Sequence, residues 1–252
     1  MSSDYIVGII PARYASTRLP AKVIVDICGK PMVQRVYEQA KQSRLLSRVI
    51  VATDDQRIEE VVHRFGGDVM MTPTTCTSGS DRCAVVAQAI DADLIVNIQG
   101  DEPLIPPTMI DAAIQPLIND QTIPMGTIVR PITTPEELYD PAVVKVVMDR
   151  NGFALYFSRS IIPYVRDVPD RTQWADHYSF YKHFGLYVFR KEFLLQYSAL
   201  SATELEKAES LEQLRVLEHG YKIRVAVTLD DSIAIDTADD LARVVNIIKG
   251  QA

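Results

Sequence analysis

Residues 5–22 of the chain read YIVGIIPARYASTRLPAK. The apolar run over residues 5–10 predicts a buried β-strand, which a proline ends. The following segment carries Arg13, Arg18 and Lys22, with two hydroxyl residues between the arginines. Ligands of open α/β sheets bind outside the carboxyl ends of the strands, so a cationic loop at this point suits a polyphosphate.

This loop has neither of the two common glycine-rich phosphate motifs. It lacks GxxxxGK[ST], which marks a P-loop, and GxGxxG, which marks a dinucleotide site. The alternative is a solvated surface loop whose cations serve solubility. Spacing alone does not decide between these two interpretations.

Composition predicts an ordinary globular chain. Its 252 residues fit one large α/β domain, or one domain with a lobe. A net charge of −7 argues against a nucleic-acid partner and requires that an anionic ligand find its cations locally.

The lack of recognisable targeting signals and the pattern of cysteines lead us to expect a cytoplasmic protein. No apolar run approaches the roughly 20 residues of a membrane span, and the N-terminus lacks a basic n-region, so we expect neither a membrane segment nor a signal peptide. Cys28, Cys76 and Cys83 are odd in number and show no CxxC spacing, which favours free thiols.

Strand and helix patterns alternate at short intervals over residues 5–120. This alternation predicts an α/β fold of the Rossmann-like three-layer type, with a mainly parallel sheet. Thr53, Asp54 and Asp55 form the expected cap of one helix, and Ser78, Ser80 or Asp81 that of another.

Residues 124–190 change to strand-like segments, which we interpret as a β-rich lobe added to the sheet. Residues 149–152 are the expected hairpin turn. A helix over 209–220 and a last helix from Thr237 return to the core. We therefore expect one domain, with a ligand-binding half (1–123), the lobe and a closing segment (191–252).

Two acids follow apolar segments. Asp101 lies in NIQGDEP (97–103) and Asp236 in AIDTADDL. Mg²⁺ prefers one or two carboxylates together with phosphate oxygens, so such a pair can hold it. Each acid also has an ordinary explanation, because Asp is common in turns and at helix N-caps. Combined with the cationic loop, the pair favours a site for a nucleotide and a metal.

Other candidate residues are weaker taken singly. TSGSDR (77–82) brings hydroxyls and Arg82 to a helix start, where anions bind well, although an ordinary cap has the same pattern. Arg159 suits a carboxylate, whereas His183 taken alone is better explained by packing. Glu212 and Gln213 fall on the expected helix over 209–220, where an exposed face is the alternative.

Nine motifs together resemble the 3-deoxy-manno-octulosonate (KDO) cytidylyltransferases, a family of nucleotide-sugar cytidylyltransferases. In chain order they are IPARYASTRLPAK, TDD, TSGSDR, NIQGDEP, VVKVV, YFSRSIIPY, KHFGLY, ESLEQLR and IDTADDL. The resemblance spans nearly the whole chain. It implies a homodimer, in which the β-rich lobe serves dimerisation and acceptor binding. It also implies that the enzyme uses CTP, KDO and two Mg²⁺ ions per active site. The products would be CMP-KDO, for lipopolysaccharide synthesis, and pyrophosphate.

The resemblance also implies roles for individual residues. Arg13, Arg18 and Lys22 would hold the CTP triphosphate, and Asp101 and Asp236 the catalytic magnesium, with Arg18 and Lys22 also acting in catalysis. Ser78, Arg82 and Gln99 would contact cytidine or position its neighbours. The sugar-acid pocket would comprise Arg159, His183, Tyr187, Glu212 and Gln213. Ser80 stands where threonine is more usual in the family, which keeps the hydroxyl.

Alternatives remain within and outside this class. A related nucleotidylyltransferase acting on neuraminic acid or methylerythritol phosphate would share the fold, and the lobe motifs argue against it. A nucleotide-sugar sensor without catalysis would have no need of two metal-binding carboxylates. The sequence does not distinguish KDO from an 8-amino analogue.

Overall fold

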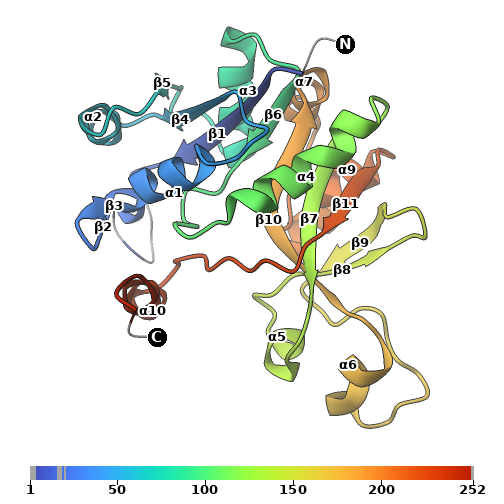
Figure 1. Cartoon of the computed structure of the whole chain (residues 1–252). Coiled ribbons are helices and arrows are strands. Elements are labelled where there is room, and N and C mark those ends of the chain that lie inside the picture. Colours follow the sequence, from blue (N-terminus) through green and yellow to red (C-terminus); the bar gives the residue numbers. More distant parts are fainter. Residues whose placement is uncertain (1–3, 16–18, 20, 251–252) are drawn as a thin grey trace.

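The structure of the protein is a computed structural model, which describes residues 4–15, 19 and 21–250 (Figure 1). Its main sheet contains nine strands, seven of them in the spatial order β11-β7-β10-β6-β1-β4-β5. Their bounds are β1 Ile6–Ala12, β4 Arg48–Thr53, β5 Val69–Met71, β6 Leu94–Asn97, β7 Met125–Pro131, β8 Lys145–Met148, β9 Ala154–Ser158, β10 Tyr181–Arg190 and β11 Ile223–Val227.

The sheet is mainly parallel, as predicted. Strand β1 pairs in parallel with β4 and β6, β4 with β5, and β7 with β11. The exception in the seven-strand path is β10, which lies antiparallel between β6 and β7. The carboxyl ends of β1 and β6 therefore meet at one edge of the sheet.

Helices cover both faces, which gives three layers (Figure 1). Helices α1, α2 and α4 pack on one face, and α3, α7 and α9 on the other. The remaining helices are α5, α6, α8, α10 and the 3₁₀ turns η1 and η2, and a short hairpin is formed by β2 and β3. Bounds are α1 Met32–Ala40, α2 Gln56–Arg64, α3 Gly79–Ala89, α4 Pro107–Asn119, α5 Pro135–Tyr139, α6 Trp174–His177, α7 Lys191–Ser198, α8 Glu204–Glu209, α9 Leu214–Glu218, α10 Ala238–Ile248, η1 Lys22–Ile24, η2 Arg171–Gln173, β2 Asp26–Ile27 and β3 Lys30–Pro31.

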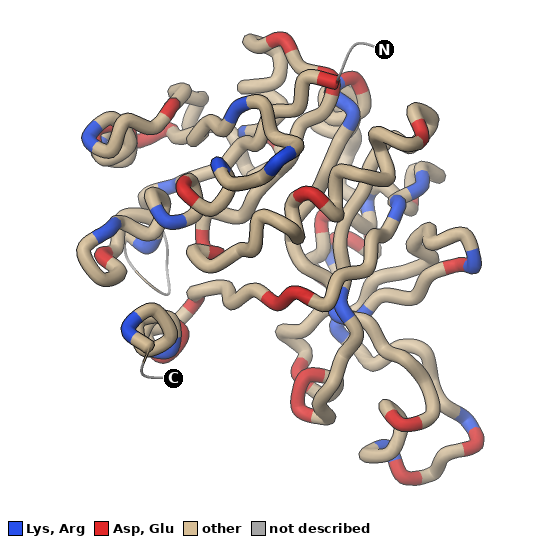
Figure 2. Tube along the Cα trace, in the orientation of Figure 1, with Lys and Arg blue, Asp and Glu red and all other residues tan. Residues whose placement is uncertain are grey.

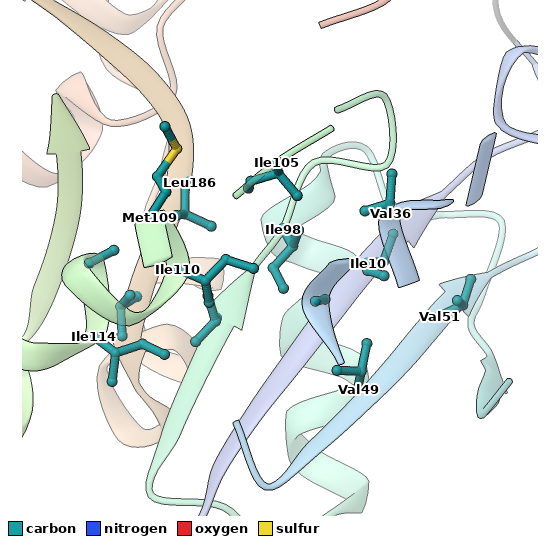
Figure 3. Close-up of a cluster of buried hydrophobic side chains, with 14 of the residues drawn as sticks. Ile10, Val36, Val49, Val51, Ile98, Ile105, Met109, Ile110, Ile114 and Leu186 are labelled. Carbon is teal, nitrogen blue, oxygen red and sulfur yellow. The ribbon is translucent and has the colours of Figure 1, made fainter. Parts of the chain in front are cut away.

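The first strand shows why both faces need cover. Ile6 and Ile10 lie in one core cluster with residues of α1 and α4, in which Figure 3 shows Ile10 near Val36 of α1. Val7 and Ile9 lie in the core on the opposite face. Successive side chains of a strand point to opposite faces, so a continuously apolar strand can be buried only between two helical layers.

The expected β-rich lobe is smaller than the segment 124–190. Strands β7 and β10 from this segment belong to the central sheet, so the parts that project are the β8–β9 hairpin, α5 and the long loop with α6 (Figure 1). The hairpin turns at Asp149, whose Oδ1 accepts from the amides of Asn151 and Phe153, both at 2.8 Å.

The expected single helix over 209–220 is wrong. The structure has two short helices, α8 and α9, separated by residues 210–213. Ser210 adopts a left-handed conformation with φ 53°, and this ends α8. The break lets Leu211 turn into the core, so Glu212 and Gln213 lie in a turn and not on a helix.

Candidate active site

A pocket of about 290 Å³ lies where β1 and β6 end, and we call it the strand-end pocket. Four separate segments line it: the loop after β1, the start of α3, the loop after β6 and the residue before Thr237. The sequence-predicted residues among its lining are Arg13, Lys22, Ser78, Arg82, Gln99, Asp101 and Asp236. Arg18 lies outside the described residues.

Lys22 joins the two predicted metal-binding acids. Its Nζ lies 2.6 Å from Asp101 Oδ2 and 2.9 Å from Asp236 Oδ1. Burial lowers the pKa of Lys22, but the charge of Asp101 and the hydrogen bonds to both carboxylates outweigh it and raise the pKa above its ordinary value. One cation therefore sits between two carboxylates at the mouth of the pocket.

Backbone contacts hold both acids in place. The amide of Ile235 donates to the Asp101 carbonyl at 2.9 Å, and the amide of Asp236 donates to Asp240 Oδ2 at 3.1 Å. The last helix begins near Thr237, as the sequence predicted, but Thr237 and not Asp236 is its N-cap, through a capping box with Asp240. Asp236 is thus fixed by the start of the last helix.

The strap over residues 228–236 carries Asp236 from β11 toward α10 and shows acidic segments in Figure 2. Asp231 anchors it, because its carboxylate lies 3.0 Å from Arg130 Nη2 and 2.9 Å from Lys182 Nζ. Both cations also contact Glu137 of α5. This four-residue cluster ties the strap to the projecting lobe.

The α3 end of the pocket is built by a helix cap. Of the three expected candidates, Ser78 is the N-cap, and its hydroxyl accepts from the amide of Asp81 at 3.0 Å. Arg82 is buried and lies 3.1 Å from Asp54 Oδ2, with a further bond to Thr72. Its charge is therefore already paired inside the protein, although it lines the pocket.

A second pocket has a volume of about 350 Å³, and we call it the lobe pocket. A hydrogen bond joins a residue that lines the strand-end pocket to one that lines the lobe pocket. Gln99 lines the strand-end pocket, and its Nε2 donates at 2.7 Å to the carbonyl of Gly185, which lines the lobe pocket. The lobe pocket brings together six polar side chains: Glu102, Lys182, His183, Tyr187, Gln213 and Ser232.

Three predicted acceptor residues meet in this pocket. The Tyr187 hydroxyl donates to Gln213 Oε1 at 3.0 Å, and Gln213 Nε2 has no hydrogen-bond partner within the described part of the chain. His183 Nε2 lies 2.9 Å from Thr127 Oγ1. The amide of Gln213 thus retains hydrogen-bonding capacity, which buried polar groups rarely leave unused.

The other two predicted acceptor residues, Arg159 and Glu212, do not line the lobe pocket. Arg159 Nε donates to the Glu209 carbonyl at 2.8 Å and Nη1 to the Pro141 carbonyl at 3.1 Å. Glu212 Oε1 accepts from the Ser80 hydroxyl at 2.8 Å. The Arg159 side chain therefore holds the backbone at residues 141 and 209, and the Glu212 side chain holds its turn against Ser80 of α3.

Glu102, Lys182 and Ser232 were not among the predicted site residues. Glu102 follows Asp101 in the sequence, and Lys182 precedes His183. Their positions next to predicted site residues could therefore have indicated them. Ser232 has no comparable motif. Burial raises the pKa of Glu102 to about 7, because its carboxyl group is withdrawn from water.

Burial also lowers the pKa of His183, to about 3. The unfolded chain therefore binds one more proton than the folded chain between pH 6.5 and 3, so stability from this group is complete above pH 6.5 and is lost as pH falls. At pH 5 the loss is about 2 kcal/mol.

We expect a His183→Gln variant to flatten the dependence of Tm on pH. Between pH 7 and 5 the wild-type Tm should fall by roughly 5 °C more than that of the variant. Calorimetry at both pH values measures this, and His63→Gln, at an exposed imidazole, is the matched control. Equal slopes for wild type and His183→Gln would show that His183 is not held neutral.

The donor set fits magnesium. Asp101 and Asp236 converge on one cation, while no group of three or more His, Cys, Asp or Glu suited to a metal occurs in the described residues. Two carboxylates without further protein ligands are what Mg²⁺ uses when substrate phosphates and water complete its shell. Structural zinc, which needs four protein ligands, does not fit.

The parallel three-layer sheet and its cationic, carboxylate-bearing strand-end pocket define a nucleotidyltransferase fold. The family model described as cytidylyltransferase matches residues 7–223. The chain belongs to the cytidylyltransferase family and is an enzyme of the nucleotidyltransferase class.

Individual relatives agree over nearly the full length. The chain is 54% identical to the 3-deoxy-manno-octulosonate cytidylyltransferase of Geobacter metallireducens, covering 95% of this chain and 96% of the relative. For the same enzyme of Geotalea uraniireducens the identity is 53%, covering 97% and 99%. A solved CMP:2-keto-3-deoxy-manno-octonic acid synthetase complexed with CTP superposes with a TM-score of 0.91 at 40% identity, covering 98% and 100%.

In the part of the chain that the structure describes, no helix combines the length and apolarity needed to cross a bilayer. The three cysteines carry free thiols, and Cys76 lines the strand-end pocket.

Proposed function

We propose that the protein transfers CMP from CTP to 3-deoxy-D-manno-octulosonate, giving CMP-KDO and pyrophosphate for lipopolysaccharide synthesis. The observation that carries the proposal is the Lys22 ammonium between Asp101 and Asp236, at the mouth of a pocket that Arg13 and Ser78 also line. Relatives identical at more than half of their positions carry the same enzyme name.

The residues of the strand-end pocket bind and orient the nucleotide. Arg13 and Lys22, together with Arg18, which lies outside the described residues, contact the triphosphate and neutralise charge that builds up on the departing pyrophosphate. Ser78 offers a helix N-terminus, and Gln99 and Arg82 position the cytidine. The anomeric hydroxyl of the sugar acid attacks the α-phosphorus, so catalysis consists mainly of alignment and charge neutralisation.

Asp101 and Asp236 would hold a magnesium ion. When bound, this ion would supply positive charge that neutralises the phosphates and lowers the pKa of the attacking hydroxyl. A second ion would be held mainly by the triphosphate, with Arg18 and Lys22 beside the departing pyrophosphate. When CTP binds, Lys22 contacts the phosphates and loses part of its contact with Asp101 and Asp236.

The lobe pocket takes the sugar acid. Its polar lining suits a polyhydroxylated ligand, and Gln213 has an amide group to spare. Lys182 supplies a cation within this lining. Neither Arg159 nor Glu212 lines the lobe pocket. Both act on the sugar acid indirectly, by holding residues 209–213 in place.

We further propose a cytoplasmic homodimer that pairs through the projecting lobe. Strand β9 pairs with β8 on one side, and Leu155 and Tyr164 of the lobe are 62% and 66% exposed. Exposed apolar side chains, one of them on a strand that pairs with only one other strand of the described residues, suit association of two copies. A sizing column with light scattering tests this, and a monomer would contradict it.

The deciding experiment is pyrophosphate release across the four nucleoside triphosphates, with KDO, its 8-amino analogue and neuraminic acid as acceptors. We expect release with CTP and KDO only when Mg²⁺ is present. Absence of metal-dependent release with every acceptor would favour a nucleotide-sugar sensor. Preference for neuraminic acid would assign the chain to the related enzyme class.

A Gln213→Ala variant should raise the KM for KDO about tenfold and leave the KM for CTP within about twofold. A site built to hydrogen-bond a hydroxyl loses affinity when its partner is removed. Steady-state kinetics with each substrate varied in turn measures the two constants.

The chain offers a matched control for this variant. Gln196 also bonds a tyrosine hydroxyl, that of Tyr221, but on the surface of α7. Gln196→Ala should change neither KM. An unaltered KM for KDO in Gln213→Ala would remove Gln213 from the acceptor pocket.

A further inference from the structure

A buried hydroxyl connects the segments that line the two pockets. Ser80, in the first turn of α3, is 0% exposed. Its Oγ donates to Glu212 Oε1 at 2.8 Å and accepts from Asn97 Nδ2 at 3.3 Å. Residues 80 and 212 are 132 positions apart in the chain, so only the tertiary fold brings them together.

Each end of this contact adjoins a pocket. Ser78 and Gly79, just before Ser80, line the strand-end pocket. Gln213, just after Glu212, lines the lobe pocket and accepts from Tyr187 there. A shift of Glu212 would therefore be transmitted directly to Gln213.

Backbone hydrogen bonds and the buried Leu211 hold the turn over residues 210–213, and two side-chain contacts fix Glu212 within it. The turn belongs to no helix, and the Tyr197 hydroxyl holds the Glu212 carbonyl at 3.1 Å. Among the described residues, the hydrogen bond to the Glu212 carboxylate comes from Ser80 alone. Burial raises the pKa of Glu212 and the Ser80 hydroxyl opposes that rise, so the bond satisfies a carboxylate that would be costly to leave without a partner.

We propose that Ser80 is a positioning residue for the acceptor, although it lies in the nucleotide-binding segment. Its hydroxyl fixes Glu212, and Glu212 sets the orientation of Gln213 and Tyr187 in the lobe pocket. The inference rests on the proposed function, in that the lobe pocket is taken to bind the sugar acid.

The kinetic signature separates this role from simple support of α3. Ser80→Ala should raise the KM for KDO five- to tenfold, with kcat and the KM for CTP within twofold. Ser80→Thr, which keeps the hydroxyl, should restore the wild-type value, and the near-isosteric Ser80→Cys should fall between them. Equal increases in both KM values, or an unchanged KM for KDO, would overturn the proposal.

A double-mutant cycle tests the route of the effect. If Ser80 acts through the turn, Ser80→Ala in a Gln213→Ala background should raise the KM for KDO by less than twofold further. Fully multiplicative effects would show that the two residues act independently and would overturn the proposal.

Hydrogen exchange provides a readout that does not depend on the substrate. Amides of residues 211–216 should exchange at least fivefold faster in Ser80→Ala than in wild type. The control is Ser43→Ala, because Ser43 is also buried and bonds a carboxylate, that of Asp111, remote from both pockets. Unchanged exchange in the turn would overturn the proposal, whereas faster exchange without any turnover of KDO would place the failure in the proposed function.

Discussion

The Asp101→Asn and Asp236→Asn variants are each expected to lower kcat by about 10²–10³-fold, because one metal-binding carboxylate supplies several kcal/mol of transition-state stabilisation. The side chains are 26% and 40% exposed, so neither substitution leaves a buried cavity or an unpaired core charge. Lys22 keeps its second acid in either variant. The fold should therefore persist, with Tm within a few degrees of wild type.

Pyrophosphate release at saturating Mg²⁺, together with thermal unfolding, measures both effects. Asp239→Asn is the matched control, since this exposed acid lies three residues beyond Asp236 and outside the strand-end pocket. It should retain wild-type turnover. If either site variant kept near wild-type kcat, the acids would not form the metal site.

Replacing Lys22 with alanine should lower kcat/KM for CTP about 100-fold, while the KM for KDO changes little. The Lys22 ammonium contacts both acids, so we expect it to contact the phosphates once nucleotide enters the pocket. Without it, the pocket loses one positive charge beside the two carboxylates, and their repulsion of an incoming triphosphate increases. Binding of CTP by calorimetry and initial rates give the two numbers.

Lys30→Ala is a suitable control for the loss of an ion pair. Lys30 bonds Glu38 at 2.6 Å, a geometry like that of Lys22, but on an exposed surface. Its removal should leave both constants unchanged. Equal CTP titration curves for wild type and Lys22→Ala would show that the loop after β1 is a solvated surface loop and not a phosphate-binding loop. The companion residue Arg18 can be tested in the same assay.

Local sequence determined several elements of this protein. The apolar first strand, the cap among residues 53–55, the start of the last helix near Thr237 and the turn at Asp149 follow from short-range rules, because periodicity and side-chain capping act within a few residues. The first strand runs over residues 6–12 and so continues through the proline that was expected to end it. Strand–helix alternation implied the parallel sheet, and a parallel sheet implied a ligand site at its carboxyl edge. Motifs in order then indicated the family.

Tertiary structure decided which candidates meet. Lys22 contacts acids 79 and 214 residues away, and no local pattern encodes such a contact. The insertion of β10 between β6 and β7 brings His183 and Tyr187 beside Gln213, whereas Arg159, from the adjoining hairpin, is held by backbone carbonyls. The break at Ser210 likewise follows from the burial of Leu211, since long-range packing outweighs the small free-energy differences of helix propensity.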